Sequence, residues 1–276
     1  MAPRLSLNSS IKNRTMRKRV FFIISLIFCA ISSMAQKPSF PYPIIPDSIK
    51  TVELRMEYLT LHYWDNFNFS DTLQLFNDNL VEQGFVNYID LLARLNKNAA
   101  SKSVSAFAKK AFSSVESKNK FESLVEHYFD DPQSPMRNDI TYLLFLRSMN
   151  ESPCFDETEK ERIEYKIKSH NKNLPGYTAL NFSFMGNDGK QHQLIDYKQK
   201  KVILYFYDPE CENCHRTWAW LNQQAIPQEY QIVKVHADDT ICELYSLQAM
   251  PTIYLLDKEN RVVLKDCSAQ VLIEHL

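Results

Sequence analysis

One stretch constrains the fold of this chain more than any other. The mostly apolar run Lys201–Tyr207 ends at Asp208-Pro209 and is followed at once by two cysteines three positions apart, Cys211 and Cys214. A nearly continuous apolar run of this length is typical of a strand that is buried on both faces. The pattern after the turn predicts a helix that begins near Cys211. Both cysteines are therefore predicted where a central strand gives way to a helix.

This placement gives the two thiols different chemistry. In the first turn of a helix, residues three apart lie close enough to form a disulfide, and the free N–H groups and dipole there favour a thiolate at Cys211. Cys214, Trp218 and Leu221 are spaced i, i+4, i+7 and are expected to share a buried face. The pattern predicts one exposed, nucleophilic thiol and one sheltered thiol that can resolve a mixed disulfide.

Elements around this junction favour an α/β domain over residues 173–276. The sequence predicts a hairpin of strands 180–184 and 191–194, then, after the central strand and its helix, a strand over 231–236 and a helix over 239–247. A second hairpin, 252–256 with 261–265, precedes a helix capped by Ser268. The predicted order is ββ, βαβα, ββα.

The preceding part, residues 47–172, shows helical periodicity and no strand pattern, so it is predicted to be an all-α domain. Its aromatic residues have helical spacing and are interpreted as core. Its histidines, His62, His127 and His170, show no metal-ligand spacing, and the sequence indicates no chemistry in this half. The predicted helices cover residues 47–67, 77–95, 101–115, 118–130, 138–150 and 156–169.

The first 35 residues resemble an export signal. A basic start at 16–19 precedes a twelve-residue apolar run and small residues suited to cleavage before Gln36. The run is shorter than the ~20 residues of a spanning helix, although a retained anchor is the alternative. The polar stretch before Met16 fits no signal and leaves Met16 open as the start. We expect an exported protein of the periplasm or cell envelope, with 36–46 as an extended lead-in.

Removal of this segment leaves 26 basic and 33 acidic residues, a net charge of −7, which argues against nucleic-acid partners. The chain has only four glycines, which excludes Gly-rich phosphate loops. Five cysteines remain after cleavage, so an oxidising compartment leaves at least one thiol unpaired. Cys154, Cys242 and Cys267 are isolated from one another in the sequence, so they imply no metal site, and the sequence implies no cofactor. Cys242 and Cys267 are interpreted as small buried residues.

The C-terminal region resembles the thioredoxin superfamily, especially the exported thioredoxin-like (TlpA/ResA-type) thiol-disulfide oxidoreductases. The resemblance rests on residues 202–214 and on Met250-Pro251-Thr252. It implies a cis-proline at Pro251, pairing of the Met250 backbone with the substrate, attack on a target disulfide through Cys211 and resolution by Cys214. The implied partners are disulfide-bearing envelope proteins and an electron donor such as a membrane thiol carrier.

This chain departs from the cytosolic members of the superfamily. Tyr205 stands where the cytosolic members carry a buried acid, and the proton acceptor that this acid provides is therefore missing. Lys234 falls where they carry a strand lysine, and either a functional or an exposed role is compatible with the sequence. Asp208, Glu210 and Glu212 surround Cys211 with negative charge, which opposes the thiolate and stabilises the disulfide. These acids favour a reductase or isomerase over an oxidase.

Two other functions stay open. His215 completes Cys211-Glu212-Asn213-Cys214-His215, which is also the attachment pattern of c-type haem. A redox-inert thioredoxin-like module could instead hold a partner through its helical half. Over residues 63–71, the helical half resembles a domain of unknown function that is found before such thioredoxin-like domains. This resemblance implies no activity. We expect the helical half to select partners or substrates.

Overall fold

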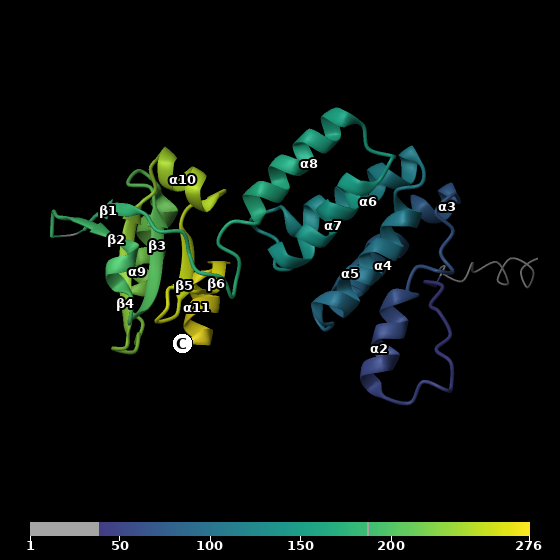
Figure 1. Ribbon diagram of the computed structural model, residues 1–276, viewed down its shortest axis with the longest axis horizontal. Helices are drawn as coiled ribbons and strands as arrows, with labels where there is room; N and C mark the ends of the chain where they lie inside the picture. Colours follow the sequence, from purple (N-terminus) through teal and green to yellow (C-terminus); the bar gives the residue numbers. More distant parts are fainter. Residues whose placement is uncertain (1–38, 187) are drawn as a thin grey trace, which may run out of the picture. The chain divides into compact units, whose positions relative to one another are not determined.

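The computed structural model describes residues 39–186 and 188–276. The predicted signal peptide and residue 187 of the predicted turn lie outside these residues. Residues 41–276 form one unit, in which helices precede a mixed α/β part (Figure 1). The described lead-in residues before Asp47 form neither helix nor strand. None of the helices in the described residues has the length and apolar character to cross a membrane.

Each helix of the first part begins at a polar side chain that accepts a hydrogen bond from a backbone N–H of the first turn. The capping residues are Thr51, Asp71, Asn77, Asn96, Ser114, Asn138 and Asp156. The helices are α2 (Val52–Leu61), α3 (Thr72–Leu75), α4 (Asp78–Ala93), α5 (Lys97–Ala111), α6 (Val115–Phe129), α7 (Asp139–Glu151) and α8 (Glu157–His170).

The first predicted helix was too long at both ends, and α3 was not predicted. The Thr51 cap starts α2 after the predicted beginning, and residues 62–66 form turns that bring Tyr63 and Trp64 into the core. The Asp71 side chain then starts α3 by accepting from two backbone N–H groups. Caps and burial, rather than apolar periodicity, therefore fix this segment. Asn96 and Ser114 likewise start α5 and α6 earlier than predicted.

Aromatic side chains fill the helical core. The ring centroids of Trp64 and Phe121 are 5.2 Å apart, and those of Phe107 and Phe121 are 5.1 Å apart, both in edge-to-face geometry. Such pairs stabilise a core beyond the area they bury. The predicted core stripe on α4 is confirmed, since its apolar residues are all buried: Leu80, Phe85, Tyr88, Ile89 and Leu92.

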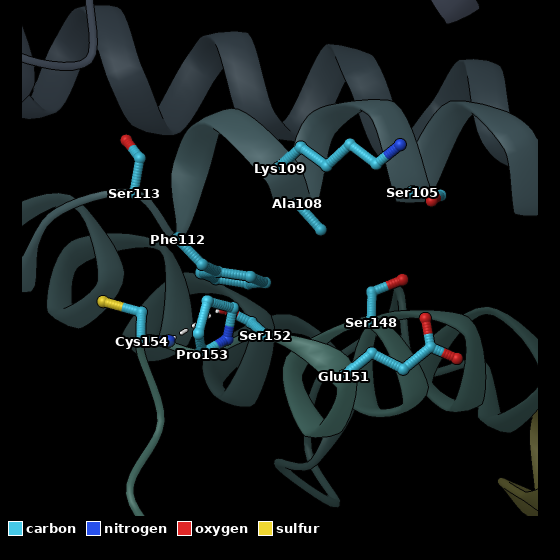
Figure 2. Close-up of a pocket in the computed structure, with 10 residues that line it drawn as sticks. All are labelled: Ser105, Ala108, Lys109, Phe112, Ser113, Ser148, Glu151, Ser152, Pro153 and Cys154. Atoms are coloured by element: carbon cyan, nitrogen blue, oxygen red, sulfur yellow. Dashed lines mark hydrogen bonds between the residues drawn. The ribbon is translucent and has the colours of Figure 1, made fainter.

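A separate pocket of about 650 Å³ lies between the end of α5 and the connection from α7 to α8 (Figure 2). Phe112 and Pro153 line it, and the Cys154 backbone N–H donates to the Ser152 hydroxyl at 3.2 Å. The Cys154 thiol therefore belongs to the helical part of the molecule.

The second part is built on a four-stranded sheet of order β4-β3-β5-β6. The central strand β3 (Lys201–Tyr207) pairs in parallel with β4 (Tyr230–His236) and antiparallel with β5 (Thr252–Leu256). β6 (Val262–Cys267) pairs antiparallel with β5. The β1–β2 hairpin (Ser183–Met185, Gln191–Gln193) precedes the sheet, and Gly189 in its turn has φ +70°, a value that favours glycine. The predicted fold class, an α/β domain preceded by an all-α part, agrees with this order of elements.

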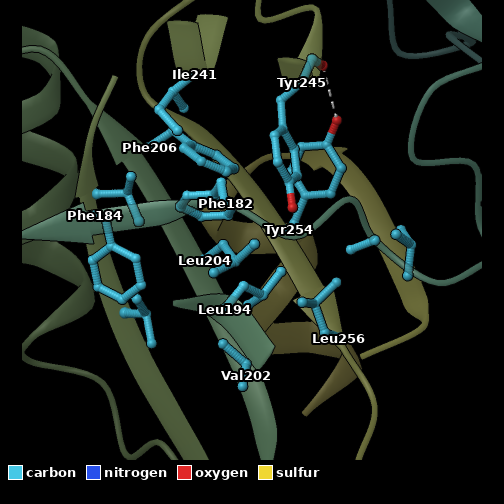
Figure 3. Packing of buried hydrophobic residues seen from close by; sticks show 14 residues of the cluster. Phe182, Phe184, Leu194, Val202, Leu204, Phe206, Ile241, Tyr245, Tyr254 and Leu256 are labelled. Atoms are coloured by element: carbon cyan, nitrogen blue, oxygen red, sulfur yellow. Dashed lines mark hydrogen bonds between the residues drawn. The ribbon is translucent and has the colours of Figure 1, made fainter. Parts of the chain in front are cut away.

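Both faces of β3 are covered, which explains its apolar run. Val202, Leu204 and Phe206 pack on one face with Ile241 of α10 (Asp239–Tyr245) and other apolar residues (Figure 3). Ile203 and Tyr205 face the other side, in a cluster with residues of α9 (Glu212–Leu221) and α11 (Ala269–His275).

Ion pairs join the helices to the sheet. Lys265 Nζ of β6 lies 2.6 Å from a carboxylate oxygen of Asp139 on α7, and both side chains are buried. Arg137 lies 2.9 Å from Asp266, also of β6. The predicted boundary after residue 172 falls in the connection between α8 and β1; the division into two domains stays a prediction.

Candidate active site

Cys211 is the N-cap residue of α9. Asp208 shapes the turn before it, accepting the Glu210 N–H on its carboxylate at 2.8 Å and the Cys211 N–H on its carbonyl at 3.2 Å. The Cys211 sulfur accepts the backbone N–H of Cys214 at 3.1 Å. A sulfur in this position receives a helix amide as a donor, which is the interaction that stabilises a thiolate.

The segment at Met250 and Pro251 lies against this cysteine. The peptide bond between the two residues is cis, and the Cys211 thiol donates to the Met250 carbonyl at 3.8 Å. The position follows from strand pairing, because Pro251 directly precedes β5, and β5 is hydrogen-bonded to the strand that leads to Cys211. The tertiary fold therefore brings together the two signatures that the sequence separates by 37 residues.

Cys214 is sheltered. Its exposure is 1%, against partial exposure for Cys211. Burial, followed by the hydrogen bond with Cys211, raises the pKa of the Cys214 thiol to about 11. The predicted shared face is buried at Cys214 and Leu221, whereas Trp218 is partly exposed.

Tyr205 occupies the strand position below this helix. Its hydroxyl donates to the Cys214 carbonyl at 2.7 Å, and its ring centroid lies 5.0 Å from that of Trp218. Burial raises the pKa of Tyr205 well above its usual value, so the hydroxyl stays protonated. It positions the start of α9 and cannot take the proton that Cys214 loses.

Lys234 is held by aromatic rings. Its ammonium lies 4.1 Å from the ring centroid of Tyr207 and 5.0 Å from that of Trp218, and the residue is partly exposed. Ring faces attract an ammonium placed over them at such distances. The structure thus places Lys234 beside Tyr207 at the end of β3 and Trp218 of α9.

The charged residues around Cys211 remain on the surface. Glu210 and Glu212 are exposed, and in the described part of the chain neither they nor Asp208 form an ion pair. His215 is also exposed, and its Nε2 lies 2.8 Å from the Pro209 carbonyl. The acids therefore leave uncompensated negative charge near Cys211.

The other cysteines are also free thiols. Cys242 and Cys267 each donate a thiol hydrogen bond to a backbone carbonyl, that of Ala237 at 3.5 Å and that of Ile253 at 3.6 Å. Burial raises the pKa of Cys267 to about 12 and also raises that of Cys242. Within residues 39–186 and 188–276, no three acidic, His or Cys side chains form a cluster that could hold a metal ion.

Sequence reasoning missed a buried polar cluster around His170. Its Nδ1 lies 2.6 Å from Asp139 and its Nε2 lies 3.0 Å from Asp130. Asp130 also accepts from Gln248, in the segment that leads to Met250. These residues come from distant parts of the chain, and no local spacing signals them.

Comparisons with known proteins agree with this description. The model of a family described as a domain of unknown function (DUF5106) matches residues 8–173. A crystal structure of a thioredoxin-like protein from Bacteroides caccae is 28% identical, with a TM-score of 0.74 over 87% of this chain and 98% of that one. Thiol-disulfide oxidoreductase ResA from Geobacillus thermodenitrificans is 25% identical over 32% of this chain and 66% of its own length, just under two thirds.

Proposed function

Because the chain belongs to the DUF5106 family and carries a thioredoxin-like fold similar to thiol-disulfide oxidoreductases, we propose that it reduces or isomerises disulfides of exported proteins. The observation that carries this proposal is the unequal pair at the start of α9. Cys211 is accessible and receives a helix amide, whereas Cys214 is buried beside it.

The reaction begins with Cys211 as the nucleophile. Its thiolate attacks one sulfur of a target disulfide; that S–S bond breaks, and the other target sulfur leaves as a thiolate that takes up a proton. Cys214 then loses its proton and attacks the Cys211 sulfur. This step forms the Cys211–Cys214 disulfide and releases the second target thiol. The target gains two electrons, and the protein loses two.

The residues around the pair support separate parts of this sequence. The raised pKa of Cys214 keeps that thiol protonated until the mixed disulfide forms beside it. Tyr205 fixes the backbone of Cys214 through a hydrogen bond of 2.7 Å. Met250, in contact with Cys211, offers its backbone to the target chain.

The acids near Cys211 favour the reducing direction. Asp208, Glu210 and Glu212 carry negative charge next to Cys211, and we expect this charge to favour the disulfide over the reduced pair. We expect a reduction potential well below the roughly −120 mV of a strong dithiol oxidant. A value near that potential would overturn the assignment as a reductase or isomerase.

The proposed site of action is the periplasm or cell envelope, which rests on the signal-like N-terminal segment. Disulfide-bearing envelope proteins are the proposed targets. Regeneration of the dithiol needs a reducing partner, for which we propose a membrane thiol carrier. No cofactor takes part in the proposed exchange.

Trapping tests the mechanism most directly. A Cys214→Ala variant should accumulate mixed disulfides through Cys211, and mass spectrometry of the trapped species would name the targets. The wild-type protein should also accelerate insulin reduction by dithiothreitol, and Cys211→Ala should abolish that acceleration. Cys154→Ala is the matched control and should leave it unchanged. An inactive wild-type protein would favour a redox-inert binding module instead.

Haem attachment through Cys211-Glu212-Asn213-Cys214-His215 is the other candidate. It requires both thiols to bond to the porphyrin. Cys214 is 1% exposed and its carbonyl is held by Tyr205, so the start of α9 would have to open before a porphyrin could reach it. A Soret band in the purified protein would revive this candidate.

A further inference from the structure

A groove of about 820 Å³ runs between α8 and the segment from α10 towards Met250. Arg162, Tyr165 and Lys168 line it from α8, and Leu247 and Gln248 line it from the other side. We propose that this groove binds an extended, carboxylate-bearing segment of the target polypeptide next to its disulfide. The inference rests on the proposed exchange reaction at Cys211, because Gln248 in one wall of the groove lies two residues before Met250, which contacts Cys211.

Polar contacts fix the two walls of the groove against each other. Gln248 donates to Asp130 at 3.4 Å, and Lys172 Nζ donates to the Glu243 carbonyl at 2.6 Å. The buried pair of Lys265 on β6 and Asp139 on α7, outside the groove, also joins the helices to the sheet. The groove is therefore formed before a target arrives, and binding does not have to order it.

One wall of the groove ends close in the chain to the exchange site. Gln248 lies two residues before Met250, whose carbonyl is bonded by the Cys211 thiol. An extended chain advances roughly 3.3 Å per residue, so a target held at Met250 reaches the groove within a few residues of its cysteine.

The backbone beside the groove can receive such a chain. In the part of the molecule that the structure describes, no hydrogen bond engages the backbone N–H groups of Gln248, Ala249 and Met250. Gln248 and Ala249 are exposed. Free amides along an exposed segment are what an extended peptide needs for main-chain pairing.

The α8 wall supplies side chains suited to a carboxylate-bearing segment. Tyr165 is 72% exposed, and Arg162 and Lys168 are exposed beside it on the same helix. Exposed aromatic and Arg side chains are typical of binding surfaces.

The charges that line the groove favour an acidic occupant. Four cationic side chains line it, with three carboxylates. One carboxylate, Asp130, is already paired with Lys166 and His170. The same pairing uses Lys166, so Arg162, Lys168 and Lys172 remain with Glu161 and Glu243, an excess of one positive charge in a chain whose formal net charge is −1.

Three synthetic peptides would test the proposal. Each carries the same disulfide-closed loop. The first peptide has no extension. The second has six added glutamates, three on each side of the loop, and the third has glutamines at those six positions. The kcat/KM of reduction by the wild-type protein should rise about fivefold with the acidic extension over the bare loop, and less with the neutral one.

Groove variants locate this effect. Arg162→Glu with Lys168→Glu, and separately Tyr165→Ala, should remove the gain while leaving reduction of the bare loop unchanged. Lys160→Glu, on α8 but outside the groove lining, and Tyr177→Ala, an exposed tyrosine elsewhere, are the matched controls and should keep the gain.

Each outcome decides the matter. Equal rates for the acidic extension and the bare loop would overturn the groove as a docking site, and equal gains from glutamate and glutamine would overturn the acidic occupant. A gain that survives the groove variants would place the contact elsewhere. If the wild-type protein does not reduce even the bare loop, the proposed function fails instead.

Discussion

Replacing Lys265 by methionine should destabilise the protein strongly, because this lysine joins the helices to the sheet while almost fully buried. Its ammonium donates to a carboxylate oxygen of Asp139 at 2.6 Å and to the carbonyls of Lys172 at 2.9 Å and His170 at 3.5 Å. Methionine keeps most of the aliphatic volume and removes the charge and all three donors.

The expected magnitude follows from burial. The side chains of Lys265 and Asp139 are 6% and 7% exposed, so the substitution leaves a buried carboxylate without its cation. Removing one partner of a buried ion pair typically costs about 3–5 kcal/mol. His170 still bonds to Asp139 at 2.6 Å, so we expect the lower end, about 3 kcal/mol.

Urea unfolding followed by tryptophan fluorescence would measure this change, since Trp64 reports on the helices and Trp218 on the sheet part. With a slope of about 2 kcal/mol per molar urea, the midpoint should fall by roughly 1.5 M. Lys201→Met is the matched control. Lys201 and Glu229 are also 2.6 Å apart but lie at the surface, so no resolvable shift is expected. Equal shifts for both variants would refute burial as the cause.

Three further predictions concern titration, packing and reactivity. Burial alone would lower the pKa of His170, but its hydrogen bonds to two aspartates outweigh burial, so the pKa of His170 is raised. The protonated ring therefore contributes its whole stabilisation below about pH 6.5, and this stabilisation is lost as the pH rises through the raised pKa. His170→Gln should flatten that dependence in urea midpoints from pH 5.5 to 9, and an unchanged slope would contradict it. Tyr205→Phe removes the hydrogen bond to Cys214 and should lower Tm by about 2–4 °C for about 1 kcal/mol, measured by circular dichroism; an unaltered Tm would mean that this bond adds no stability. Iodoacetamide at pH 8 should alkylate Cys211 well before Cys214, whose pKa is about 11 and whose exposure is 1%, and equal labelling by peptide mass spectrometry would argue against the assigned roles.

The elements nearest the cysteine pair were the most predictable. Lys201–Tyr207 was predicted with its observed bounds, because both of its faces are buried and the chain there has little choice of residue type. The start of the helix at Cys211 was predicted within one residue, since the strand end and the turn at Asp208 are local signals.

The helical part was predicted less well where aromatic residues crowd together. Tyr63 and Trp64 fit a helical pattern, yet they lie in turns after α2. Apolar spacing records that a side chain is buried but does not distinguish a helix from a turn that buries the same side chain. Tertiary packing decided between the two.

The sequence alone determined that Cys211 and Cys214 lie at a strand–helix junction, because three-residue spacing, a buried strand and a helix start are all written within one short stretch. Only the tertiary structure decided what surrounds that junction. Asp130, Asp139, His170 and Lys265 meet across four separate elements or connections, and Gln248 reaches Asp130 over a separation of 118 residues. Such contacts form when distant segments pack, so their energy depends on the whole fold. No local spacing of residues in the sequence indicates them.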